Sequence, residues 1–382
     1  MKYTKLERNW VMYDVGNSAL VLLNTSVVPI YFNAINTGAS SADLVVAWGN
    51  AQTIASLVIA MLMPILGALA DYAGNKIKFF LGFFLTGLVL CLAQAIPMSA
   101  MAFLTVYVLC TIGLNSSMTF YDAMLPDITT DERMDAVSSS GYAWGYIGST
   151  VPFIICLALI MGGPALGVPT MLATRLSFII TGAWWLIFTL PLIRTYKQKY
   201  GRERGSEDTI GHIVGGVFSE VGHTMREIAH NKTVLVYMIA FFFYIDGVHT
   251  VISMATSYGS ALGIDSTQLV LALLVTQFVA FPSAIIYGKL AGRVGTLNMI
   301  LVAVAAYMAS CSLPRSSSRP PLSFGCLPFW SACSRAACRR SAVATLAALS
   351  PRKSPTSTTA SLTSLVVMQA LWAPSWCRSS PR

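Results

Sequence analysis

The chain has 382 residues, of which 55% are hydrophobic and only 11% are charged. Soluble proteins carry about 25% charged residues, so this composition excludes an ordinary soluble globular protein. The formal charge of +9 does not indicate nucleic-acid binding, because residues 1–311 hold 16 basic and 16 acidic residues and are neutral. The whole excess lies in residues 312–382, which hold nine basic residues and no acid.

Nine apolar stretches predict membrane-spanning helices, since about 20 mainly apolar residues are needed to cross a lipid bilayer. Basic residues concentrate before the first stretch and after the second, fourth and sixth. By the positive-inside rule, the N-terminus is expected in the cytoplasm and the protein in the inner or plasma membrane. The stretches are residues 10–35, 44–70, 77–99, 101–124, 137–162, 173–194, 234–257, 267–291 and 296–311.

The order of these stretches predicts an all-α membrane protein made of two halves. Six helices in residues 1–194 form the first half, a cytoplasmic linker covers residues 195–233, and three helices lie in residues 234–311. This layout is typical of two-half secondary transporters. The second half is therefore predicted to be truncated after its third helix and followed by an aberrant basic tail, residues 312–382.

A short repeat marks the same helix end in both halves. GALADYAG (residues 67–74) follows the second stretch, and GKLAGRVG (residues 288–295) follows the eighth. The glycines allow a tight turn, and an acid between them can pair with a basic side chain or cap a helix. An ordinary polar turn is the alternative interpretation. The candidate gating residues are Gly67, Asp71, Gly74, Lys76, Gly288 and Gly295.

Residues 67–76 resemble the loop signature of the major facilitator superfamily, G-x-x-x-D-x-x-G-x-[KR]. Four further stretches resemble one branch of it, the autophagy-related vacuolar amino-acid effluxers and their bacterial relatives: WVMYDVGNS (10–18), FYDAMLPDI (120–128), SGYAWGYIG (140–148) and YIDGVHT (244–250). The resemblance implies a two-half helix bundle that exports amino acids or similar small solutes.

Polar residues inside the apolar stretches are candidates for a substrate or proton pathway. Asp14 and Asn17 share a helix face, as do Asp246 and His249, and an ionisable group within a membrane helix is costly and so points to function. Interfacial solvation of Asp14 and a polar cluster around Asp246 are the alternatives. The remaining pathway candidates are Asn24, Asn50, Gln52 and Gln277.

Two acids, Asp122 and Asp127, flank the predicted cytoplasmic end of the fourth helix. They are expected to act either in a gate or as a solvated helix cap. The glycines Gly141, Gly145 and Gly148 form a stripe on the fifth helix that close packing explains without a ligand.

An enzyme is not predicted. The two intramembrane acids do not match the second motif of intramembrane aspartyl proteases, because Asp246 follows Tyr-Ile. The sequence shows neither a nucleotide-binding glycine loop nor a zinc-type cluster, so no cofactor or metal is expected. The expected partners are the lipid bilayer, a small solute and, as a candidate coupling ion, the proton, for a chain that works as a monomer.

The tail, residues 312–382, contains 16 serines and eight prolines and has no clean apolar span. A disordered tail is one interpretation. A shifted reading frame starting near codons 308–313 is the more specific one, because the genetic code can test it. In the shifted frame, Met368 before Gln369 specifies Ala and Trp372 before Ala373 specifies Gly, and both residues suit the effluxer pattern. The predicted function is that of a secondary-active exporter, proton-coupled or facilitative, and the alternative is a non-functional truncated remnant of such a transporter.

Overall fold

The computed structural model describes residues 3–70 and 72–201, with positions 226, 230, 232, 235, 239, 265, 267–275, 277, 278 and 282. The side chains of residues 131, 132, 135 and 139 are outside this description. The predictions for residues 296–311 and the tail lie outside the described residues, as does that for residues 234–257 apart from positions 235 and 239. So do those for Asp71, Asp246, His249, Gly288 and Gly295.

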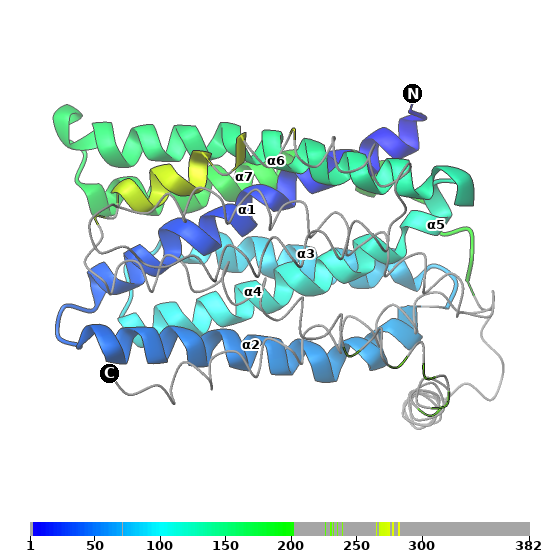
Figure 1. Ribbon diagram of the computed structural model, residues 1–382, viewed down its shortest axis with the longest axis horizontal. Coiled ribbons are helices and arrows are strands. Elements are labelled where there is room, and N and C mark those ends of the chain that lie inside the picture. The colour runs from blue at the N-terminus through cyan, green and yellow to red at the C-terminus, as the bar shows by residue number, and fades with distance from the viewer. Residues whose placement is uncertain are drawn as a thin grey trace.

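Six helices of the described part are long and apolar enough to cross a membrane, which agrees with the six predicted in the first half. They run side by side along the long axis of the molecule (Figure 1). A short helix and a 3₁₀ turn complete the described elements. These are α1 Lys5–Ile35, α2 Ser41–Ala70, α3 Asn75–Ala93, α4 Ala100–Ala123, α5 Leu125–Ile128, α6 Asp131–Gly162, η1 Gly163–Leu166 and α7 Thr170–Thr195.

All six membrane-spanning helices begin earlier than the apolar pattern predicted, α1 and α6 by the most. The predicted start of α1 at residue 10 is wrong, because a capping box formed by Thr4 and Glu7 starts the helix at Lys5. The side chain of Thr4 accepts a hydrogen bond from the Glu7 amide, and the Glu7 carboxylate accepts one from the Thr4 amide. Likewise α6 begins at Asp131 and not at residue 137. In α1 the capping box satisfies the first amides, so the helix extends beyond the apolar span.

The helix α1 is the most buried of the six. It packs against α6 through the glycine stripe, where a Cβ on Gly148 would lie 2.4 Å from Cγ1 of Val15. A Cβ on Gly145 would lie 2.7 Å from Oγ of Ser18. The stripe thus serves close helix packing, as expected.

An aromatic cluster joins α1 to α3, α4 and α7. The rings of Trp10 and Tyr121 stack at 4.3 Å, and Tyr13 lies edge-on to Phe80 at 5.1 Å. The indole of Trp10 also donates a hydrogen bond to the Tyr121 carbonyl over 3.1 Å. Trp10 lies in the second turn of α1 and Tyr121 in the last turn of α4, so their contact lies near the end of the bundle where α1 begins. The short helix α5 lies at the same end (Figure 1). We call this the α5 end.

Candidate functional site

The α5 end contains a buried ion pair between Lys76 and Asp127. The ammonium Nζ and the carboxylate Oδ2 are 2.8 Å apart, and the two side chains are 1% and 0% exposed. The same ammonium donates a second hydrogen bond to the Ala123 carbonyl, over 3.1 Å. Two opposite charges removed from water stabilise each other only when their geometry and their remaining hydrogen bonds are satisfied, as they are here.

Local sequence places both partners. Gly74 adopts φ +78°, a left-handed conformation that glycine tolerates, and so turns the chain directly into α3 with Lys76 in the first turn. On the other side, Pro126 lies in the first turn of α5, where its missing amide costs nothing. The short helix that follows α4 therefore aims Asp127 inward, beneath the end of the bundle.

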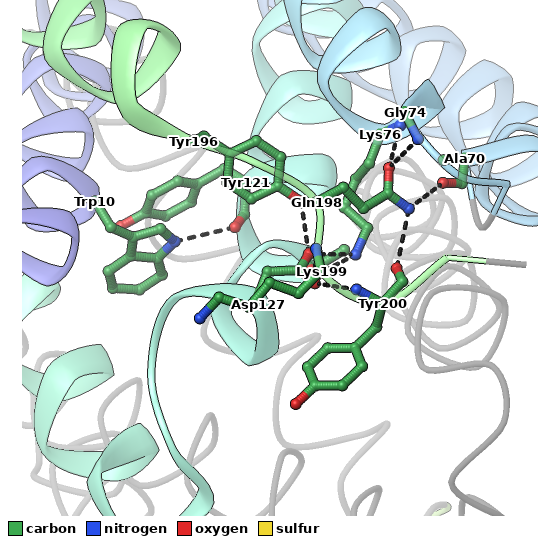
Figure 2. Close-up of polar contacts among 11 residues, drawn as sticks. Trp10, Ala70, Gly74, Lys76, Tyr121, Asp127, Tyr196, Gln198, Lys199 and Tyr200 are labelled. Atoms are coloured by element: carbon green, nitrogen blue, oxygen red, sulfur yellow. Dashed lines mark hydrogen bonds and ion pairs between the residues drawn. The ribbon is translucent and has the colours of Figure 1, made fainter.

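The segment that follows α7 closes over this carboxylate (Figure 2). The Tyr196 hydroxyl donates to Asp127 Oδ2 over 2.6 Å. The amides of Lys199 and Tyr200 donate to Oδ1 over 3.1 and 2.9 Å. Burial and the Asp127 carboxylate raise the pKa of Tyr196 far above its usual range, so its hydroxyl remains protonated and keeps donating.

The prediction that Asp127 is a solvated helix cap is wrong, because its side chain is fully buried and holds Lys76. Asp122 is half-buried at the end of α4. Of the predicted gating residues that the structure describes, Gly74 and Lys76 meet at this site, and Gly67 is buried within α2. The residues from 196 to 200 were not predicted as part of the site. From the sequence they form only the start of the polar linker, because a run of Tyr, Lys and Gln matches no motif.

A second ion pair ties α1 to α6 at the same end. The Glu7 carboxylate lies 2.8 Å from Nη2 of Arg133 and accepts a hydrogen bond from the Thr129 hydroxyl over 2.7 Å. Glu7 is 2% exposed and Arg133 31% exposed. The α5 end is therefore fastened by two separate carboxylates, one on α5 and one on α1.

Within the bundle, Asp14 and Asn17 are 3% and 1% exposed. The side-chain amide of Asn17 donates a hydrogen bond to Asp14 Oδ1 over 3.3 Å. A Cβ on Gly141 of α6 would lie 2.8 Å from Asp14 Oδ2, so the carboxylate lies directly against the α6 backbone. The alternative of a solvated, interfacial Asp14 does not fit this burial.

The other pathway candidates are spread over several helices. Asn24 is 6% exposed on α1, and the half-buried Gln52 of α2 donates to the Tyr107 hydroxyl over 3.0 Å. Asn50 is exposed on α2, and Gln277 is half-buried. Among the described residues, no hydrogen bond joins these four side chains, so their role in a pathway stays a prediction.

Known families and structures match most of the chain. The family described as "Vacuole effluxer Atg22 like" matches residues 50–312. A Bacillus subtilis (strain 168) protein described as an uncharacterized MFS-type transporter, YxiO, is 42% identical over 318 residues, which are 81% of this chain and 73% of that protein. Autophagy-related protein 22-1 of Aspergillus niger is 27% identical over 156 residues, 38% of this chain and 24% of that protein.

Solved transporters share the fold at low sequence identity. The proton:xylose symporter XylE of the major facilitator superfamily (MFS) superposes with a TM-score of 0.68 at 12% identity, over 99% of this chain and 89% of that one. A mutant of the nucleoside transporter NupG gives 0.65 at 12% identity, over 97% and 90%. The fold is therefore that of the superfamily, and the chain is an integral membrane protein and not an enzyme. On the family match and the Bacillus relative, the chain belongs to the Atg22-like family of MFS transporters.

Proposed function

We propose that the protein exports amino acids or similar small solutes across the plasma membrane, and that the Lys76–Asp127 ion pair closes its cytoplasmic end. The observation that carries the proposal is the burial of this pair at a point where three parts of the chain meet. The α2–α3 turn brings the cation, α5 brings the carboxylate, and the segment after α7 covers both. A contact of this kind has two discrete states, made or broken, as an alternating-access gate requires.

The orientation of the proposal rests on the charge pattern. Arg194 lies in the last turn of α7, and Lys197 and Lys199 follow the helix at the α5 end, where Lys5 and Arg8 lie at the start of α1. Loops at the opposite end, such as residues 36–40, carry no basic residue. Positive charge is retained on the cytoplasmic side, so the α5 end faces the cytoplasm in this proposal.

Proton coupling is a further part of the proposal. Asp14 is buried against α6, where a charged carboxylate is costly and a protonated one is not. We assign it, with Asp246 in the second half, as a candidate proton carrier. The variant Asp246→Asn should then abolish gradient-driven transport while leaving exchange of bound solute, and unchanged pH dependence would assign Asp246 to structure.

Transport by inverted membrane vesicles tests the main proposal. Vesicles that contain the chain should accumulate one or more radiolabelled amino acids from a panel when a proton gradient is imposed. Asp127→Asn should reduce this uptake, whereas Lys78→Met, an exposed cation two residues from Lys76, should not. Vesicles that accumulate no member of the panel above the empty-membrane level would reject amino acids as the substrate class.

A second candidate is a non-transporting remnant with a shifted reading frame. The family match ends at residue 312, and residues 312–382 hold nine basic residues and no acid. Sequencing the gene around codons 308–313 tests this. A single-base insertion or deletion whose repair restores transport in the vesicle assay would support the remnant, and an intact frame would reject it.

A further inference from the structure

The chain leaves α7 in a direction that keeps it against the bundle. The helix ends at Thr195, and Tyr196 is extended, with φ −70° and ψ 134°. Its ring is buried, with 6% exposure, while Lys197 and Lys199 are exposed. Residues 196–201 therefore cross the α5 end as an extended segment, which we call the strap.

The oxygen and the nitrogen of the Gln198 side-chain amide both form hydrogen bonds with the backbone at the α2–α3 turn (Figure 2). Gln198 Oε1 accepts hydrogen bonds from the amides of Gly74 and Lys76, over 3.0 and 3.2 Å. Its Nε2 donates to the carbonyls of Ala70 and Tyr200, over 3.4 and 3.0 Å. The first two bonds satisfy amides at the start of α3, which have no partner within their own helix.

The strap backbone also approaches the turn closely. A Cβ on Gly201 would lie 2.8 Å from Cα and 3.0 Å from the amide nitrogen of Ala73. The strap thus contacts the end of α2 and the start of α3 through Gln198, and α5 through Asp127.

We propose that the strap is the moving latch of the cytoplasmic gate and that Gln198 is its positioning residue. Resting on the proposed function, this inference adds which segment of the chain moves when the gate opens. Removing the strap takes three hydrogen bonds from Asp127 and two from the start of α3, which leaves the buried ion pair open to water.

Labelling of a buried reporter cysteine tests the proposal in the full chain. Ala123, whose carbonyl binds Lys76, is 5% exposed and becomes the reporter Ala123→Cys, in a chain whose tail cysteines are changed to serine. In inverted vesicles, Gln198→Ala should raise the rate of reaction with a membrane-impermeant maleimide about tenfold, because local opening becomes less costly without four hydrogen bonds. Gln198→Glu, which keeps the acceptor and loses the donor, should fall between.

The neighbouring strap residue supplies the control. Lys197→Ala removes an exposed side chain and should leave the rate within about twofold of the parent. The buried cysteines Cys91, Cys110 and Cys156 should stay unreactive in every variant, which separates local opening from unfolding. Equal labelling of the Gln198→Ala and Lys197→Ala chains would overturn the proposal.

A substitution that pushes the strap away from the turn tests the motion itself. A Cβ at position 201 would lie 2.8 Å from Cα of Ala73, so Gly201→Ala should displace the strap and raise reporter labelling above the parent. Labelling that is unaffected by this substitution would contradict the proposed role of the strap. None of these readouts requires transport, so a wrong substrate class would leave them unchanged, whereas a wrong latch would fail here even in vesicles that transport.

Discussion

At the scale of single residues, the Lys76–Asp127 pair matters because both charged groups are removed from water. Both side chains are almost fully buried, and each is completed by neutral groups: the Ala123 carbonyl for the cation, and the Tyr196 hydroxyl for the carboxylate. In such a site the loss of one partner costs more than the loss of both, since an unpaired charge would remain buried.

Removing one partner should therefore destabilise the first half strongly. Lys76→Met alone should lower the free energy of unfolding by ~3–5 kcal/mol, because Asp127 is left uncompensated. Adding Asp127→Leu should recover much of this loss. The measurement is thermal unfolding of purified protein in detergent. The control is Lys78→Met, which removes an exposed cation from the same turn of α3. Additive costs of the two substitutions would contradict the ion-pair account.

The turn before α3 depends on one backbone conformation. Gly74 has φ +78°, and a Cβ there would meet nothing within 4 Å. Gly74→Ala should therefore cost ~1–2 kcal/mol through backbone strain alone. Gly74→Asn should cost less, because asparagine tolerates the left-handed region better. Thermal unfolding of the two variants compares them directly, and an alanine variant as stable as the parent would show that the turn can adopt another conformation.

At the scale of helices, the close spacing between α1 and α6 depends on glycines of α6, which carry no side chain. Asp14, Val15 and Ser18 of α1 all lie against glycines of α6. Small residues let two helix backbones approach and gain van der Waals contact, which is the main source of helix association inside a membrane. The contact also holds Asp14 in place, so packing and the proposed proton site depend on the same stripe.

Filling this stripe should push the two helices apart. Gly148→Ala would place a methyl group 2.4 Å from Val15, and overpacking of this kind costs ~1–3 kcal/mol. Gly82→Ala in α3 is the matched control, since a Cβ there meets nothing within 4 Å and alanine is the better helix former. Val15→Ala should rescue the Gly148→Ala chain. Equal unfolding temperatures for the two single variants would argue against close α1–α6 contact.

The helices of the first half could be predicted from the sequence, but the site could be predicted only in part. Apolar length determines where a span lies, and glycine spacing indicated a closely packed face on α6 without naming its partner, because both depend on neighbouring residues. Lys76 and Asp127 were each recognised as candidates, yet their pairing joins residues 51 positions apart and leaves no local pattern. Gln198 was missed for the same reason, since its partners are backbone groups that every residue type carries.

At the scale of the whole molecule, the ion pairs of the described residues are not distributed evenly between the two ends of the bundle. The α5 end carries both ion pairs of the described residues and the strap. Toward the opposite end of the bundle, α7 and α1 are linked by an uncharged acceptor, the Tyr31 hydroxyl, to which Nε of Arg175 donates over 3.0 Å. An exporter must open to the cytoplasm to load its solute, so we expect the α5 end to be the one whose closure is regulated.

This assignment predicts which residues an impermeant reagent can reach from each side of the membrane. Lys197→Cys lies in the strap beside the basic residues of the α5 end, and Gly38→Cys lies in the exposed loop between α1 and α2 at the other end. Because positive charge is retained in the cytoplasm, an impermeant maleimide added to intact cells should label position 38 and spare position 197. In inverted vesicles the pattern should be reversed, which controls for the intrinsic reactivity of each cysteine. Ready labelling of position 197 from outside intact cells would place the α5 end, and with it the proposed gate, on the external face.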